Sequence, residues 1–177
     1  LLRWIKQYII FISFLFISCE IVEPELDNPL DTEASAEKGV TPPALVFFPD
    51  NVTTSTGGNA VVNVYALEVQ NVAGVVAKVS YDNTKLNVAS VSPGSFFSDS
   101  QNPIFITEDN AGTLDIYSFY MGSDKVKSGT GPIAVIIFTT KVPGSSQLSI
   151  VQGSELLDEN DVNIEIKGLG KGVVNAQ

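Results

Sequence analysis

The chain has 177 residues, of which 20 are acidic and 10 are basic, and its formal net charge of −10 is combined with no histidine and a single cysteine. A surface this acidic repels phosphate backbones, which makes nucleic acid a poor partner. The composition also lacks the commonest metal ligands and nucleophile–base pairs, so we expect no metal site, no cofactor and no enzymatic activity.

The first eighteen residues have the pattern of a secretion signal. Two cations precede an apolar run from Tyr8 to Ile17, and Ser18 then stands before Cys19. A membrane-spanning helix needs about 20 apolar residues, and this run is only about half as long. We therefore expect a cleaved leader over residues 1–18 rather than a transmembrane anchor.

The position of Cys19 adds a second signal to the leader. Residues 15–19 read LFISC, which resembles the lipobox of bacterial lipoproteins, where a diacylglyceryl group is attached to the cysteine thiol before cleavage on its N-terminal side. Two or more acyl chains give stable membrane anchoring. The alternative is a structural cysteine that lies in a leader by chance. We expect Cys19 to be the lipidation site, with the protein held by this lipid alone on the bacterial envelope, and we favour the outer membrane.

Residues 19–43 are expected to form an extended tether. From Glu20 to Pro43 the sequence contains seven acids, one lysine and four prolines, without a sustained apolar period. Proline and charge repulsion both favour an extended, solvated chain.

Short apolar and β-branched runs follow from Ala44 onward, separated by clusters of Gly, Pro, Asn, Asp and Ser. The runs are ALVFF, NAVVNVYAL, GVVAKVSY, KLNVASV, PIFIT, GTLDIYSFYM, PIAVIIFTT, QLSIV, NIEIK and GVVNA. None of them sustains a helical period, and only residues 155–160 suggest a single helical turn. Many short strands at even spacing predict one antiparallel β-sandwich or barrel over residues 44–177.

Alternation along these runs assigns their faces, because successive side chains of a strand point to opposite sides. The charge of Lys78 marks the face that it shares with two neighbours as solvent-exposed, and Asp115 does the same in a later run. The outward residues are Val76, Lys78, Ser80, Asp115, Tyr117 and Phe119.

The run PIAVIIFTT differs because both of its faces are apolar. Val135 and Ile137 lie on one side, opposite Ala134, Ile136 and Phe138. Such a strand is either central and covered on both sides, or its outer face binds something.

Several segments between Val46 and Val174 resemble a cohesin domain when they are taken in order. They are the NVAG turn at 71–74, the strand end Tyr81-Asp82, the strand and turn from Leu86 to Pro93-Gly94, and the later segments EDNAGTLDIY, GTGPIAVIIFTTKVPG and GKGVVNA. The resemblance covers essentially the whole domain.

This resemblance implies a nine-stranded antiparallel jelly-roll sandwich of cohesin type. It also implies a protein partner, a dockerin or a related module, in an extracellular polysaccharide-degrading or surface assembly. In well-studied dockerin-binding cohesins an Asn and an Asp face the partner from the strand ending in Tyr-Asp, where this chain has Gly74 and Val76. Those polar contacts are therefore missing here.

Together these observations predict a partner-binding face. Its members are Val76, Lys78, Ser80, Asp115, Tyr117, Phe119, Val135 and Ile137. An exposed apolar patch of this kind marks a protein interface. The alternative is that a loop, the tether or a second copy of the chain covers it.

Three other functions receive less support from the sequence. Direct binding of a polysaccharide, as in a carbohydrate-binding lipoprotein, is the second hypothesis, but sugar sites favour aromatic platforms and the only tryptophan, Trp4, lies in the leader. Residues 158–161, DEND, are rich in oxygen but lack the spacing of a calcium loop. Carboxylate pairs can cleave glycosides, yet the acids here fall in turns and in the tether.

Overall fold

The computed structural model describes residues 36, 39–100, 103–121 and 125–177. The predicted leader, Cys19 and most of the predicted tether lie outside the described residues. Within the part that is described, no helix is both long and apolar enough to cross a membrane.

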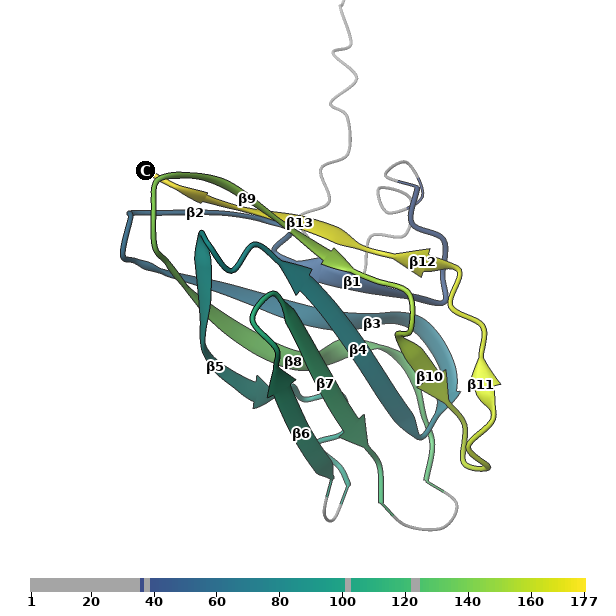
Figure 1. The fold of residues 1–177 in the computed structure, drawn as a ribbon. Coiled ribbons are helices and arrows are strands. Elements are labelled where there is room, and N and C mark those ends of the chain that lie inside the picture. Colours follow the sequence, from purple (N-terminus) through teal and green to yellow (C-terminus); the bar gives the residue numbers. More distant parts are fainter. Residues whose placement is uncertain (1–35, 37–38, 101–102, 122–124) are drawn as a thin grey trace, which may run out of the picture.

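Thirteen strands make up the described fold (Figure 1). They are β1 (Ala44–Phe48), β2 (Asn51–Thr54), β3 (Asn59–Val72), β4 (Gly74–Tyr81), β5 (Leu86–Pro93), β6 (Ile104–Asp109), β7 (Thr113–Phe119), β8 (Lys127–Thr140), β9 (Gly144–Ile150), β10 (Glu155–Leu157), β11 (Asn163–Ile164), β12 (Gly168–Leu169) and β13 (Lys171–Ala176). Four of them, β2, β10, β11 and β12, have four residues or fewer. The nine longer strands coincide with nine of the ten predicted runs.

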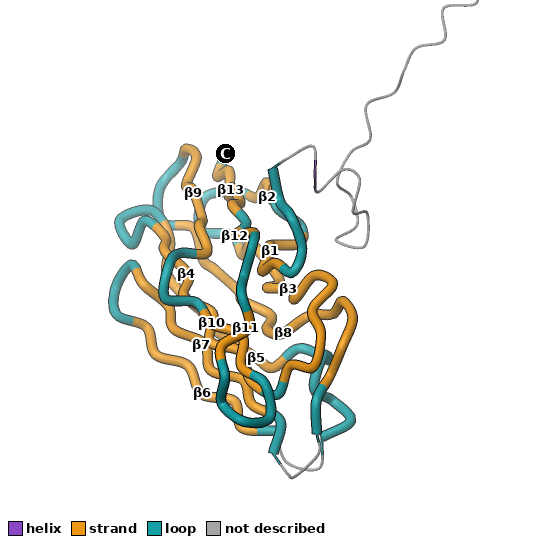
Figure 2. Tube along the Cα trace, turned by 90° about the vertical axis from the view of Figure 1, so that its right-hand side faces the viewer, coloured by secondary structure: helices purple, strands orange, loops and turns teal. Residues whose placement is uncertain are grey.

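The strands form two sheets that stack as a sandwich (Figures 1 and 2). The smaller sheet has the order β12-β1-β3-β8-β5. The larger sheet follows β11-β10-β4-β9-β13-β2, with β7 paired to the other edge of β4, and β6 paired to β7. Every pair between two of the nine longer strands is antiparallel, while β1 with β12 and β13 with β2 are parallel. The predicted sandwich is confirmed.

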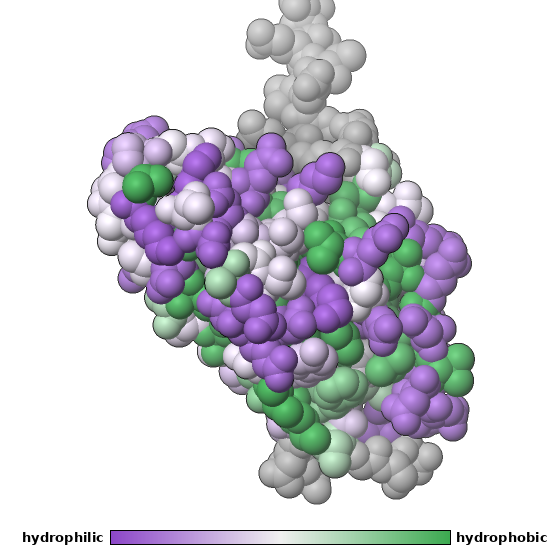
Figure 3. Space-filling model, in the orientation of Figure 1, coloured by the Kyte–Doolittle hydropathy of each residue, from purple (hydrophilic) through white to green (hydrophobic). Residues whose placement is uncertain are grey.

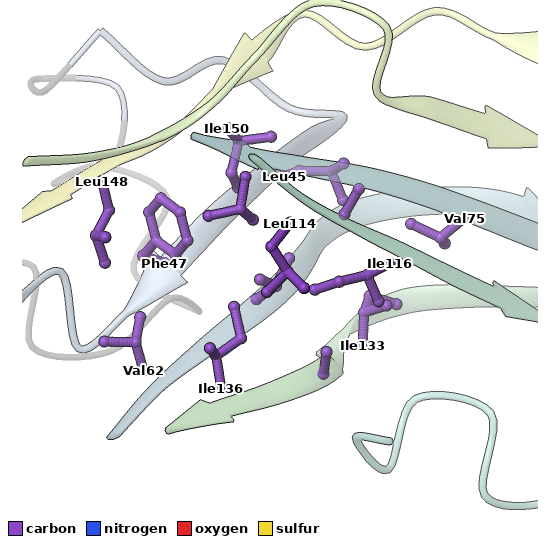
Figure 4. Packing of buried hydrophobic residues seen from close by; sticks show 14 of the residues in the cluster. Leu45, Phe47, Val62, Val75, Leu114, Ile116, Ile133, Ile136, Leu148 and Ile150 are labelled. Atoms are coloured by element: carbon purple, nitrogen blue, oxygen red, sulfur yellow. The ribbon is translucent and has the colours of Figure 1, made fainter. Parts of the chain in front are cut away.

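One hydrophobic core fills the space between the sheets. Alternation explains which residues of most strands belong to it, but in β8 the neighbours Ile133 and Ala134 are both buried, because the register of β8 against β3 shifts there. Leu114 and Ile116 of β7 are buried and point toward β8, from which Ile133 and Ile136 point back (Figure 4). Burying a side chain of this size contributes about 1.5–3 kcal/mol. This two-sided packing fixes which side of β4 and β7 faces the solvent.

The segment from Glu155 onward differs from its prediction. Instead of a helical turn, β10 pairs with the first half of β4, while β9 pairs with the second half of the same edge. An unpaired strand edge leaves backbone N–H and C=O groups without partners. Three residues of β10 provide those partners, so the backbone pairing decides the local structure. In the run NIEIK only Asn163–Ile164 forms a strand.

The packed chain begins before the first strand. Val40 packs against a small cluster on the outer side of the smaller sheet, formed by Ala44, Val46 and Leu67. Packing therefore extends four residues into the segment that was expected to be solvated.

Candidate functional site

The outward side of β10, β4, β7 and β6, here called the β4–β7 face, holds six of the eight predicted partner-binding residues. They are Val76, Lys78, Ser80, Asp115, Tyr117 and Phe119. These side chains point outward because the alternating positions on the same strands, such as Val75 and Ile116, are buried in the core. The cross-strand register then arranges the outward residues in rows.

The central row of this face is apolar. Val76 lies opposite Tyr117, and Tyr117 lies opposite Ile106 of β6, while Glu155 of β10 pairs with Val76 on its other side. Val76 is only 8% exposed despite pointing outward, whereas Ile106 is 53% exposed. Aromatic and β-branched cross-strand pairs stabilise a sheet, and in this row they also produce a continuous apolar strip.

A second apolar row lies at the end of the face. Gly74 is opposite Phe119, Phe119 is opposite Ile104, and Leu157 of β10 pairs with Gly74. A Cβ atom on Gly74 would come within 2.5 Å of Cδ1 of Phe119. The ring therefore lies directly over the glycine backbone. Gly74 is one of the two residues that replace the polar residues of the family this chain resembles, and its lack of a side chain makes room for this ring.

The third row is charged. Lys78 Nζ donates a hydrogen bond to Asp115 Oδ2 at 2.9 Å, and this contact raises the pKa of the Lys78 ammonium above its usual value. Glu108 of β6 lies directly opposite Asp115, which places two like charges side by side. Asp115 Oδ1 is buried and has no hydrogen-bond partner. This row therefore carries more negative than positive charge.

Two residues of the face were missed by the sequence analysis. Ile104 and Ile106 are 38% and 53% exposed, which places them among the most exposed large hydrophobic residues in the described part of the chain. In the space-filling view, hydrophobic side chains gather at the lower end of this face, where β6 lies (Figure 3). The same alternation that assigned Asp115 would have found them, because Ile104 and Ile106 share a face with Glu108.

A groove lies beside the end row of the face. It has a volume of about 180 Å³. The residues that line it are Ala73, Gly74, Ile104, Phe119, Tyr120, Met121, Lys125, Leu157, Asp158, Glu159 and Asp161. We call it the end groove. Its lining combines apolar side chains with the carboxylates of Asp158, Glu159 and Asp161 from the turn after β10.

Val135 and Ile137 do not belong to this face, which corrects the prediction. Both lie on β8, which pairs with β3 and β5 in the smaller sheet. Their side chains point outward, but on the opposite side of the sandwich from Tyr117. Alternation determines which side of a strand is buried, yet it carries no information about which sheet the strand joins.

The acidic turn after β10 has a structural role. Asp158 Oδ1 accepts hydrogen bonds from the backbone N–H groups of Asn160 and Val162 at 2.8 and 2.9 Å. Among the residues that the structure describes, no group of three or more His, Cys, Asp or Glu side chains is arranged to hold a metal ion.

Two larger hollows lie away from the β4–β7 face. They have volumes of about 360 and 410 Å³, and both are bordered by Asp50 and Lys171. None of the predicted partner-binding residues lines either hollow.

Comparison with known protein families gives one match. Residues 45–173 match the family described as the cohesin domain. A search of curated proteins finds no match.

Solved structures with the same fold include several cohesins. The non-cellulosomal cohesin from the hyperthermophilic archaeon Archaeoglobus fulgidus has 20% sequence identity and a TM-score of 0.62, over 76% of this chain and 90% of that one. A type II cohesin domain from the cellulosome of Acetivibrio cellulolyticus has 19% identity and a TM-score of 0.63, over 75% and 93% of the two chains.

A third structure contains a partner. The sixth cohesin of scaffoldin B from Acetivibrio cellulolyticus, solved in complex with a mutant Cel5 dockerin, has 24% identity and a TM-score of 0.62. The similarity covers 76% of this chain and 98% of that cohesin.

Proposed function

Because this chain belongs to the cohesin domain family, whose members are non-catalytic protein-interaction modules, we propose that its β4–β7 face binds a dockerin-type or related protein module. The observation that carries the proposal is the continuous apolar strip formed by Val76, Tyr117 and Ile106, together with the end row of Phe119 and Ile104. Apolar and aromatic side chains at the centre of an interface supply most of its binding energy.

The chemistry of this face differs from a recognition mode based on hydrogen bonds. Gly74 and Val76 offer no polar side-chain atoms, and the ring of Phe119 covers Gly74. Recognition on this face therefore depends on burial of apolar surface, with Lys78, Asp115 and Glu108 as charged neighbours. Charged neighbours of this kind influence the rate and the specificity of association more than its affinity.

The wider proposal concerns location. We infer that Cys19 carries a lipid anchor and that the module is held outside the cytoplasm, where it recruits its partner to an assembly that degrades polysaccharide or covers the cell surface. The support is the LFISC sequence at the end of an apolar leader. Replacing Cys19 with Ala should abolish metabolic labelling with a fatty acid and release the protein from the membrane fraction. Unchanged labelling in that variant would contradict the anchor.

The binding proposal is tested with two matched substitutions. Ile106 on the β4–β7 face and Val61 on the opposite sheet are both exposed, at 53% and 46%. The full chain, purified in detergent, captures partners from the secreted proteins of its source, and the affinity of each captured protein is then measured with Ile106→Ser and with Val61→Ser.

We expect Ile106→Ser to weaken binding by about 1–3 kcal/mol, or roughly tenfold to a hundredfold, and Val61→Ser to leave it unchanged. The reverse result would place the interface on the smaller sheet. Retention on insoluble glycan without any protein partner would favour carbohydrate binding instead.

A further inference from the structure

A second region of the larger sheet, away from the β4–β7 face, carries a hollow of the size that small ligands occupy. Its volume is about 410 Å³, and pockets for small molecules have volumes of about 300–1,000 Å³. The hollow lies over β9, β13 and β2, near the C-terminus in Figure 1. The described residues that line it are Asp50, Asn51, Gln147, Leu148, Lys171, Gly172 and Val173. We call it the β13 hollow.

One cross-strand row of outward residues borders this hollow. Gln147 of β9 pairs with Val173 of β13, and Val173 pairs with Asn51 of β2. The row is on the outer side of the sheet, because the alternating residues Ser146 and Val174 are buried. Neighbouring strands lie about 4.8 Å apart, so the two residues with amide side chains are roughly 10 Å apart. The row therefore presents one apolar residue between two amides.

The polar side chains at the hollow have hydrogen-bonding capacity left for a ligand. Asn175 Nδ2 donates a hydrogen bond to Asn51 Oδ1 at 3.0 Å, which leaves the NH₂ group of Asn51 to donate. Within the described part of the chain, the side chains of Gln147 and Lys171 make no hydrogen bond. Gln147 can donate and accept, whereas Lys171 only donates. Hydroxyl groups suit this mixture, because each of them both donates and accepts.

The charged side chains that line the hollow differ in sign. Asp50 and Lys171 both border it, and the same two residues border the neighbouring hollow of about 360 Å³. A charge on the ligand would be attracted by one of them and repelled by the other. At physiological salt the Debye length is about 8 Å, so the more distant acids of the chain add little. The pair therefore gives no advantage to an anion or to a cation.

We propose that the β13 hollow is a binding site for an uncharged monosaccharide. The hydroxyl groups of the sugar would meet the side chains of Asn51, Gln147 and Lys171, while the C–H face of its ring lies against Val173. No aromatic side chain is among the described residues that line the hollow, which separates this site from the aromatic platforms of polysaccharide-binding surfaces. The inference goes beyond the proposed function, because the β13 hollow shares no residue with the β4–β7 face.

The side-chain amides of the row serve as reporters in a direct test. The full chain is labelled with ¹⁵N, purified in a detergent without a sugar headgroup, and titrated with glucose, galactose and mannose. We expect at least one of these sugars to shift the NH₂ signals of Asn51 and Gln147 with a dissociation constant of roughly 1–10 mM, since a few hydrogen bonds hold a small ligand weakly. The absence of any shift at roughly tenfold higher concentrations would overturn the inference.

Charged derivatives of the same sugar test the electrostatic part of the inference. The uronic acid adds a negative charge to the sugar that binds, and the protonated 2-amino sugar adds a positive charge. We expect each derivative to bind roughly threefold or more weakly than the parent sugar at physiological salt. In Lys171→Gln, which retains Asp50, this difference should disappear for the 2-amino sugar. Equal or tighter binding of either derivative to the unaltered chain would overturn the selection for an uncharged ligand.

Paired variants separate the hollow from exposed amides elsewhere. Asn51→Ala with Gln147→Ala should abolish the shift of the backbone amide signal of Val173. A control of equal composition, Gln70→Ala with Asn87→Ala, changes two exposed amides of β3 and β5 that do not line the hollow and should keep the shift. Retained binding in the first pair, or lost binding in the control, would contradict the site.

A single variant guards against a loss of structure. Asn51→Ala also removes the hydrogen bond from Asn175, whereas Gln147→Ala breaks none among the described residues. Gln147→Ala alone should weaken sugar binding roughly threefold or more and leave urea unfolding unchanged. Unweakened binding in this variant would contradict the role of the row.

The sugar site and the partner-binding face are tested by different measurements. A saturating amount of the sugar should leave the affinity for a captured partner unchanged, because the two sites share no residue. Competition between sugar and partner would contradict a separate site. The Ile106→Ser variant tests only the β4–β7 face, and it should bind the sugar as the unaltered chain does.

Discussion

The outer sides of the two sheets contain similar residues in different arrangements. On the β4–β7 face, Tyr117 has Val76 on one side and Ile106 on the other. On the smaller sheet, Val135 lies between Asn63 of β3 and Ser92 of β5. An apolar side chain becomes part of the apolar core of an interface more readily when its cross-strand neighbours extend the apolar surface. At Tyr117 and Val135 the register of the strands, more than the composition of either strand, determines how far the apolar surface extends.

The comparison can be tested most strongly by truncating matched residues on the two faces. Tyr117→Ala and Phe119→Ala should each weaken partner binding by about 1–3 kcal/mol. Val135→Ala and Ile137→Ala should leave binding unchanged. All four side chains are partly buried, so each variant should lose a similar amount of stability, about 1 kcal/mol. Calorimetric binding and urea unfolding are measured on the same four proteins.

Either of two results would break this comparison. A loss of binding in the Val135 and Ile137 variants would show that the partner contacts the smaller sheet. Global unfolding of the Tyr117 or Phe119 variant would show that these rings belong to the core.

The two sheets also meet at Tyr81, a titratable residue. Its ionisation is expected to have a smaller effect, on the free energy of unfolding. Tyr81 of β4 packs against Phe138 of β8 with 5.4 Å between the ring centres, and its hydroxyl donates a hydrogen bond to Asp109 Oδ1 at 2.6 Å. Burial, followed by the hydrogen bond to Asp109, raises the pKa of Tyr81 to about 12. The native state therefore holds this proton more tightly than the unfolded state, in which the pKa is about 10.

This pKa shift predicts how stability depends on pH. The contribution of Tyr81 is fully present below pH 10 and is lost as the pH rises toward 12, by about 2 kcal/mol in the free energy of unfolding. Urea unfolding at pH 9 and pH 11.5 measures the loss, and Tyr81→Phe should reduce it. An equal loss in the Phe variant would assign the effect to other groups, among them Lys78.

The smallest effect concerns the contact between Gly74 and Phe119. Gly74→Ala places a Cβ about 2.5 Å from the Phe119 ring, so the ring must move. We expect a loss of about 1 kcal/mol in stability. In a Phe119→Leu background the same substitution should cost less, and the double-mutant cycle gives the coupling between the two positions. Additive effects would mean that the ring does not press on the glycine.

The sequence predicts the parts of the fold that depend on local pattern. Turn residues delimit the nine longer strands, and the charges of Lys78 and Asp115 identify the outward side of β4 and β7. Pairing between strands is not local, which is why Val135 and Ile137 were assigned to the wrong face. The three residues of β10 carry too little pattern to be recognised, and they form a strand because the edge of β4 needs hydrogen-bond partners. Ile104 and Ile106 could have been found from alternation with Glu108.

The packing of Val40 against Ala44, Val46 and Leu67 has a geometric consequence for the protein at a surface. This contact lies on the outer side of the smaller sheet, so the chain enters the domain on the side opposite the β4–β7 face. In a chain anchored at Cys19, tension along the tether would turn the smaller sheet toward the lipid. The β4–β7 face would then point away from the bilayer, and a large partner could bind it without steric hindrance from the membrane.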